Sequence, residues 1–161
     1  MMKSESSTIA YEKVPIIARA GLSVQIPSAQ SIQGYSVVSH KLLRNFHAVC
    51  VTPRSSWVRF VGFRASAEDF TVMYPRVLRN GILLVDRHYN SVRPYRRGWT
   101  DMHVVLKKEG SILVREVELH GQQLILRPQR REEALQFIKI RPRQSYGDFL
   151  LGRVCHIEGE P

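Results

Sequence analysis

Arginine-rich stretches with interleaved tyrosine are the part of this sequence with the clearest chemical use. A guanidinium group binds a phosphate or a carboxylate through a fork of N–H donors, and a tyrosine ring stacks on a base. The chain carries a formal net charge of +10. The stretches contain Arg93, Tyr95, Arg96 and Arg97, then Arg127, Arg130 and Arg131, and finally Arg141 and Arg143. They predict a surface that binds nucleic acid or an acidic partner, with a merely solvated basic surface as the alternative.

Hydroxyl groups offer a second kind of chemistry, nucleophilic attack. Ser66 and Thr71 lie close together in the sequence, and such a residue becomes a nucleophile where a nearby base removes its proton. The lysines available as a base, Lys107 and Lys108, lie at a predicted turn, where solvent keeps an amine protonated. The sequence therefore leaves enzymatic activity uncertain and favours a protein that is not an enzyme.

Metal and cofactor chemistry finds no support in the residue spacing. The six histidines and the two cysteines, Cys50 and Cys155, lack the short spacings of metal ligands, and there is no glycine-rich phosphate loop. We therefore expect no metal, no cofactor and no disulfide. No apolar run approaches the roughly 18 residues of a membrane span. No signal-peptide core follows Met1, so we expect a cytoplasmic protein without membrane contact.

Short runs of β-branched and aromatic residues between turn signals predict the elements that position these groups. The segment 104–127 is typical of three strands joined by turns at Gly110 and Gly121, because glycine takes positive φ without a steric cost. Other strands are expected at 14–17, 57–65, 82–85, 137–140 and 149–157, a short helix at the start of 37–51, and a basic loop holding Arg87 at 86–98. The predicted fold class is mainly β, a compact curled or barrel-like antiparallel sheet with one short helix.

Six pieces of the sequence occur in an order that matches a known family. They are Val14-Pro15 with Arg19-Ala20-Gly21, Phe63-Arg64-Ala65-Ser66, Asn80 to Arg87, Ser111 to Val117, Leu124 to Pro128, and Gly152-Arg153-Val154. In this order they resemble the LexA/UmuD family of self-cleaving serine peptidases, which includes the C-terminal domains of phage repressors. The resemblance implies a signal-peptidase-like β domain over 14–161, and the polar, serine-rich composition of residues 1–13 predicts a flexible arm before it. It also implies a linker at 14–36 with the family's Ala-Gly cleavage bond at Ala20 and Gly21.

The catalytic residues of that family are replaced here. The family uses a serine nucleophile in a Gly-Asp-Ser-Met motif and a lysine base. The serine position falls on Asp69 or, in a second alignment, on Val72, and the lysine position falls on Arg115. A guanidinium group does not deprotonate in a protein, so Arg115 cannot activate a hydroxyl. We hypothesise that Asp69 and Arg115 form an ion pair in place of the dyad; alternatively, Arg115 is an exposed strand residue and Asp69 a loop cap.

Three functions follow as hypotheses. The resemblance implies a catalytically inactive LexA/UmuD-like domain that acts by dimerisation and protein binding in the DNA-damage (SOS) response or in prophage or mobile-element regulation. Its partners would be a second copy or a related protein, and a DNA polymerase or regulator. The first alternative is an active self-cleaving peptidase in which Ser66 or Thr71 attacks the Ala20 carbonyl. The second alternative is a basic nucleic-acid-binding β domain that uses the arginine stretches.

Overall fold

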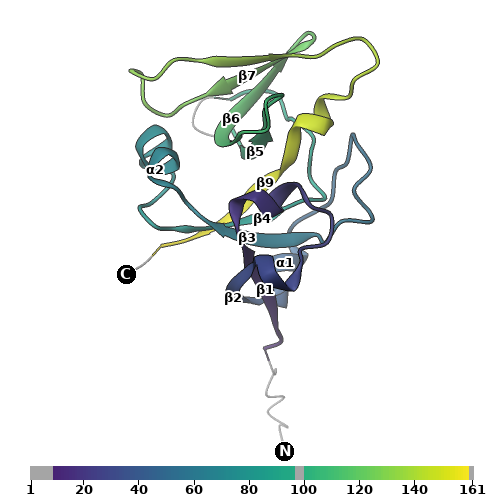
Figure 1. The fold of residues 1–161 in the computed structure, drawn as a ribbon, viewed down its shortest axis with the longest axis vertical. Helices are drawn as coiled ribbons and strands as arrows, with labels where there is room; N and C mark the ends of the chain where they lie inside the picture. The colour runs from purple at the N-terminus through teal and green to yellow at the C-terminus, as the bar shows by residue number, and fades with distance from the viewer. Residues whose placement is uncertain (1–8, 97–99, 160–161) are drawn as a thin grey trace, which may run out of the picture.

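Nine strands form one sheet in the computed structural model of the chain, which describes residues 9–96 and 100–159. They are β1 (Tyr11–Ile17), β2 (Ile32–Ser39), β3 (Phe60–Arg64), β4 (Ile82–Asp86), β5 (Met102–Leu106), β6 (Ile112–His120), β7 (Gln123–Arg127), β8 (Gln136–Lys139) and β9 (Leu150–Glu158). Their spatial order is β2-β1-β3-β4-β9-β5-β6-β7-β8. Figure 1 shows the hairpin of β1 and β2 toward one end of the molecule and β6 and β7 toward the other.

Short helical segments connect these strands. They are the α-helices α1 (His40–Arg44) and α2 (Ala67–Met73) and the 3-10 helices η1 (Arg19–Ser23), η2 (Ala29–Ser31) and η3 (Tyr146–Phe149). The α1 helix begins after Ser39, whose side chain accepts a hydrogen bond from the amide of Leu42, and it confirms the short helix expected at the start of 37–51. The α2 helix is not among the expected elements, because seven residues are too few to show a helical period in the sequence.

The mainly β fold predicted from the sequence is confirmed, and so is its three-stranded meander. β5 pairs with β6, and β6 with β7, both antiparallel. Gly110 has a φ of 96° and Gly121 a φ of 60°, so both turns use the backbone conformation that favours glycine. One correction concerns the form of the sheet, which is open and mixed rather than barrel-like and antiparallel. β1 runs parallel to β3, and the edge strands β2 and β8 lie at opposite ends of the sheet.

The segment expected to be an arm and a linker is largely part of the sheet. Residues 1–8 of the expected arm lie outside the described residues, whereas its last residues, 11–13, begin β1. The expected linker, 14–36, supplies the rest of β1 and the start of β2. Val14 and Val38 are buried in one cluster with Leu84 of β4, and this burial holds the hairpin in the sheet. In the order of the sheet β1 lies between β2 and β3, so it is an interior strand.

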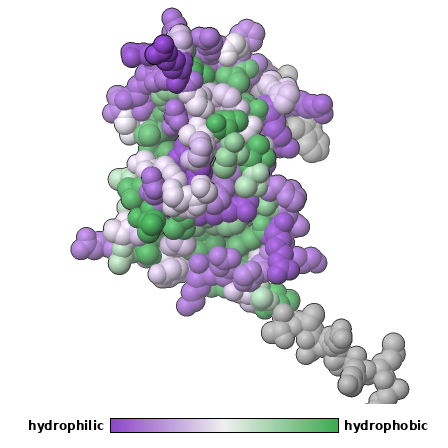
Figure 2. Space-filling model, turned by 90° about the vertical axis from the view of Figure 1, so that its right-hand side faces the viewer, coloured by the Kyte–Doolittle hydropathy of each residue, from purple (hydrophilic) through white to green (hydrophobic). Residues whose placement is uncertain are grey.

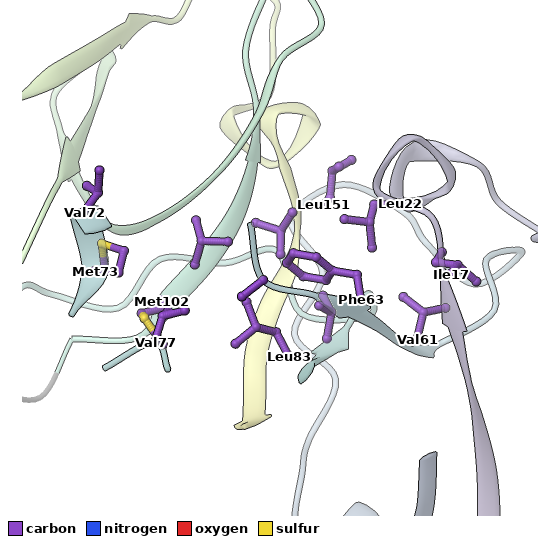
Figure 3. Packing of buried hydrophobic residues seen from close by; sticks show 14 residues of the cluster. Ile17, Leu22, Val61, Phe63, Val72, Met73, Val77, Leu83, Met102 and Leu151 are labelled. Carbon is purple, nitrogen blue, oxygen red and sulfur yellow. The ribbon is translucent and has the colours of Figure 1, made fainter. Parts of the chain in front are cut away.

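Phe63 of β3 lies at the centre of the largest buried hydrophobic cluster. Figure 3 shows Leu83 and Leu151 close to its ring, with Met73 and Met102 to one side. None of these five side chains is more than 3% exposed. Because they come from β3, β4, β9, α2 and β5, this cluster holds α2 against the middle of the sheet.

Arg87 follows β4 and is completely buried, in contrast to the basic loop expected there. Its guanidinium group donates hydrogen bonds to the carbonyl oxygens of Val58, Leu22, Val24 and Gln25. Burial lowers the pKa of Arg87 to about 10, which leaves the group charged at neutral pH. A buried cation needs such partners because losing its hydration is unfavourable. Arg87 therefore ties the end of η1 and the residues after it to the end of β4.

Replacing Arg87 by methionine keeps an unbranched side chain but leaves those carbonyl oxygens without their donor. We expect Arg87→Met to lower the free energy of unfolding by about 3 kcal/mol, measured by urea denaturation followed by circular dichroism. The matched control is Arg141→Met at an exposed position, where a change below about 0.5 kcal/mol is expected. Equal losses in the two variants would contradict the role assigned to Arg87.

Candidate functional site

Asp69, one of the two positions aligned with the family's nucleophile, lies in the first turn of α2. Ser66 caps this helix: its side chain accepts a hydrogen bond from the amide of Asp69 at 3.1 Å, and Asp69 Oδ2 accepts one from the amide of Ser66 at 2.9 Å. The Asp69 side chain is 1% exposed. A carboxylate is favoured at this place because the positive end of the helix dipole faces it. Asp69 is thus a helix-capping residue with a buried charge.

Arg19, from the segment that resembles a cleavage site, neutralises Asp69. Its Nη1 donates to Oδ2 of Asp69 at 2.7 Å, and its Nη2 donates to Oδ1 at 2.9 Å. The same Nη2 also donates to the carbonyl oxygen of Ile112, at the start of β6, at 2.6 Å. A two-pronged pair is the strongest geometry between arginine and a carboxylate. Arg19 therefore joins η1, α2 and β6 at one point.

Ala20 and Gly21, the residues of the expected cleavage bond, lie in the 3-10 helix η1 rather than in an extended linker. The amide of Gly21 donates to the carbonyl oxygen of Ala18 at 2.8 Å, and the carbonyl of Gly21 accepts from the amide of Val24 at 3.0 Å. Gly21 is buried, although Ala20 is exposed. The next residue, Leu22, is fully buried in the central cluster. The peptide between Ala20 and Gly21 is therefore folded into the domain.

Arg115 is a buried residue of β6, not an exposed strand residue. Its Nη1 donates to the carbonyl oxygen of Val114 at 2.8 Å, and its Nη2 lies 3.5 Å from Oε1 of Glu68. Burial lowers the pKa of Arg115 from its usual value, and the nearby carboxylates of Glu68 and Asp69 oppose that shift. The hypothesised ion pair between Arg115 and Asp69 is not formed, because Arg19 binds both carboxylate oxygens of Asp69.

The alternative catalytic residues are not arranged for nucleophilic attack. Ser66 and Thr71 line one pocket of about 400 Å³ beside α2, but the Ser66 hydroxyl is engaged in the helix cap. Lys107, one of the possible bases, is paired with Glu109 at 3.1 Å. Within the described part of the chain, no lysine forms a hydrogen bond with either hydroxyl, as a general base would. Val72, the second aligned position, is 5% exposed and packs in the core.

The first two arginine stretches meet at the end of β7. The Arg127 guanidinium lies 4.8 Å from the centre of the Tyr95 ring, a cation–π contact, and Arg127 Nη2 donates to Oε2 of Glu118 at 2.7 Å. Arg93 forms a two-pronged pair with Asp101, with both hydrogen bonds at 2.9 Å. These contacts fix the arginines in place and neutralise part of their charge.

The remaining arginines lie near the two ends of strand β7. β8 runs antiparallel to β7, so the chain leaves β8 near the start of β7, whereas Arg127 ends β7. β7 has five residues, so its two ends are about 13 Å apart. Arg130, at the Arg127 end, reaches the carbonyl oxygen of Thr71 at 3.5 Å. The exposed members of the predicted surface are Arg93, Arg96, Arg130 and Arg131 on the Arg127 side and Arg141 and Arg143 after β8, while Arg97 lies outside the described residues. The arginines of the predicted surface therefore form two groups, one near each end of β7.

A pocket of about 540 Å³ lies within the first of these groups. Its lining includes Arg93, Pro94, Arg96, Asp101, His103 and Val117. His103 of β5 is 1% exposed, and burial lowers its pKa to about 4. Sequence reasoning missed His103, because a lone histidine in a strand without ligand spacing carries no signal. It also missed the pairing of Arg19, for which the Ser66-x-x-Asp69 pattern of a helix start is the one available signal.

No protein-family model matches the chain, and no curated protein matches it. The resemblance to the LexA/UmuD peptidases therefore stays a prediction. In residues 9–96 and 100–159 there is no group of three or more side chains placed to hold a metal ion. No helix in these ranges has both the length and the apolar character needed to cross a membrane. Cys50 and Cys155 are both free thiols, and Cys50 is exposed.

The two acidic residues at the start of α2 provide a matched test of this site. Asp69→Asn keeps the shape of the cap but removes the charge that Arg19 binds, so we expect a loss of about 2 kcal/mol in the free energy of unfolding. Glu68 is 63% exposed in its 3.5 Å contact with Arg115, so Glu68→Gln should change stability by less than about 0.5 kcal/mol.

Limited proteolysis measures the local effect of the same two changes. Asp69→Asn should speed cutting within residues 18–25, because η1 loses its attachment to α2, while Glu68→Gln should leave the cutting pattern unchanged. Unaltered cutting in both variants would show that the contact between Arg19 and Asp69 does not hold this segment.

Proposed function

We propose that this chain is a non-catalytic LexA/UmuD-like domain that acts by binding other proteins. The observation that carries the proposal is the two-pronged pair between Arg19 and Asp69. In the alignment that puts the family's nucleophile at Asp69 rather than Val72, this pair joins the nucleophile position to the segment aligned with the substrate. In a peptidase, the residue at this position would cut the segment. In this chain, Asp69 would instead hold the segment in place through Arg19.

Two further features support a binding role over self-cleavage. The position of the lysine base is occupied by Arg115, which stays protonated at any pH at which the protein is folded. The Ala20–Gly21 peptide lies in a helical turn whose groups are hydrogen-bonded locally, so they are not extended across a cleft. Self-cleavage needs a base that can release its proton and a substrate peptide extended in the active site. These two features provide neither, and both are compatible with the fold.

Partner binding in this proposal uses the open ends of the sheet. β2 is an edge strand, and its outward side chains Tyr35 and Val37 are 56% and 61% exposed. β8 is the other edge, with Phe137 51% exposed. On the face shown in Figure 2, hydrophobic residues are visible in patches between hydrophilic ones. Unpaired strand edges with apolar neighbours suit a second copy or a related domain.

In the cell, such a domain would work in the cytoplasm in the DNA-damage response or in the regulation of prophages or mobile elements. It would act as a homodimer or a heterodimer, or as a subunit that docks on a DNA polymerase or a regulator. This assignment rests on the resemblance of the sequence pieces to the LexA/UmuD family.

The intact mass of the purified protein tests whether it cleaves itself. We expect a single unchanged mass after incubation at pH 7 and at about pH 10, where a lysine base would be deprotonated. Ser66→Ala and Thr71→Ala serve as controls. A break between Ala20 and Gly21 that disappears in one of these variants would identify a working nucleophile and overturn the proposal.

A nucleic-acid-binding role is a second candidate, favoured by the contact of Arg127 with Tyr95. That contact places the guanidinium group of Arg127 over the ring of Tyr95, while Arg93 and Arg96 lie within two residues of Tyr95 in the sequence and Arg130 lies three residues after Arg127. Arginines near an aromatic ring are the combination that holds single strands by phosphate contact and base stacking. The group excludes Arg141 and Arg143, which lie at the other end of β7. The two roles are compatible, since none of these arginines belongs to the edge strands β2 and β8, although Arg130 contacts α2 at the carbonyl oxygen of Thr71.

Salt dependence of single-stranded DNA binding tests the second candidate. With four arginines in contact, the slope of log affinity against log salt should be about −3 at the steepest. Arg130→Gln should make the slope shallower by about 0.7, whereas Arg143→Gln, at the other end of β7, should leave it unchanged. A slope near zero, or equal effects of the two substitutions, would remove this candidate.

A further inference from the structure

The edge strand β2 lacks the features that usually keep a free strand edge from pairing with another chain. Its eight residues, IQGYSVVS, include no charged side chain and no proline. In residues 9–96 and 100–159 it pairs with β1 alone, and the one irregularity in that pairing falls at Ile32, at the end of the strand. Proteins protect a free edge with lysine, proline, a bulge or a very short strand. Residues 33–39 have none of these, so the outer edge of β2 is suited to a further strand.

The opposite edge of the sheet has the protection that β2 lacks. β8 is only four residues long, and it ends at Lys139, which is exposed. A strand of this length offers few backbone groups to a partner, and a lysine on a free edge opposes pairing. Of the two edges, β2 is therefore the one that favours a partner strand.

Exposed apolar side chains lie beside the edge of β2, on one face of the β1–β2 hairpin. Tyr35 and Val37 are two residues apart in β2, so their side chains point to the same face. The ladder puts Tyr11 of β1 opposite Ser39, on that face as well. All three side chains are more than half exposed. A strand added to β2 would cover Tyr35 and Val37 on their open side.

The sequence of β2 is self-complementary when two copies of it run antiparallel. A two-fold axis at Ser36 places Tyr35 of each copy opposite Val37 of the other copy. An aromatic residue and a β-branched residue form a favourable cross-strand pair, and the symmetry makes this pair twice. An axis at Tyr35 would instead put Val37 opposite the polar Gln33. The axis at Ser36 is thus the one that pairs apolar with apolar side chains.

We propose that β2 pairs antiparallel with β2 of a second copy of this chain, about a two-fold axis at Ser36, so that two nine-stranded sheets become one. A second copy is favoured over a different protein because β2 itself contains, at the right spacing, the residue that suits Tyr35. The same axis brings Gly34 opposite Val38 of the other copy, and the space around Gly34 is open. The inference rests on the proposed binding role, and it adds a partner, an interface and a register to that role.

Sedimentation equilibrium of the full chain tests the proposal. We expect a monomer–dimer equilibrium between micromolar and submillimolar protein, at moderate salt, which screens the repulsion between two copies with a net charge of +10 each. Amide hydrogen exchange in β2 should slow as the dimer forms, because the outward N–H groups gain acceptors. A chain that stays monomeric over this range overturns the proposal and leaves β2 to a strand of another protein.

Variants at the two edges locate the interface. Val37→Glu lies opposite Lys13 of β1, so it suits the hairpin, but it loses the contact with Tyr35 of the second copy and should weaken the dimer at least tenfold. Phe137→Glu makes a similar change on β8 and should leave the dimer unchanged. Both positions are exposed, and circular dichroism checks that both variants fold. Equal effects of the two changes, or a larger effect of Phe137→Glu, would overturn the proposal.

A double variant tests the register. Tyr35→Lys combined with Val37→Glu places a lysine opposite a glutamate twice in the proposed dimer, so the double variant should dimerise more tightly than Val37→Glu alone. With the axis at Tyr35, two lysines would face each other, and a double variant weaker than Val37→Glu would show that the proposed register is wrong.

Failure of this inference is distinct from failure of the proposed function. Self-cleavage, seen in the intact mass, would overturn the non-catalytic role whatever the oligomeric state. A monomer that does not cleave itself would overturn only the pairing of β2.

Discussion

Two guanidinium groups hold residues 19–25 against the sheet, and the candidate site depends on that attachment. Arg19 fixes the start of this segment to Asp69 and Ile112, and Arg87 fixes its end through carbonyl oxygens. Between them, Leu22 is fully buried. The segment is therefore held by hydrogen bonds at both ends and by hydrophobic packing in the middle. Whatever the domain binds, it does so with this segment as part of its folded surface.

The arginines of this protein serve two different purposes, and composition alone does not separate them. Arg54 and Arg87 are 4% and 0% exposed, and both donate to backbone carbonyl groups. Arg87 also lies 5.0 Å from the centre of the Trp57 ring. These residues connect loops to the core, and they are not available to a phosphate group. The net charge of +10 therefore overstates the charge available to an anionic ligand, because the buried arginines contribute to it but cannot reach such a ligand.

Sequence reasoning succeeded where structure is determined by neighbouring residues. The meander of β5, β6 and β7 follows from β-branched runs and two glycine turns, and both signals lie within a few residues of each other. The parallel contact of β1 with β3 joins Ile16 to Gly62, and no local sequence pattern predicts a pairing between strands so far apart in the chain. The same limit applies to the site. Arg19 and Asp69 are 50 positions apart, and only the fold determines which of several arginines reaches that carboxylate.

The attachment of the β1–β2 hairpin has a consequence for how the domain opens. β3 pairs with β4 along its whole length, whereas β1 is registered with β3 only at Ile16 and Gly62. Side-chain contacts and the core thus contribute more to holding the hairpin than backbone hydrogen bonds do. A unit joined in this way opens as a whole while the rest of the sheet stays folded. We therefore expect the hairpin to open more readily than β3 and β4, and the contacts of Arg19 and Arg87, which hold residues 19–25 between β1 and β2, oppose that opening.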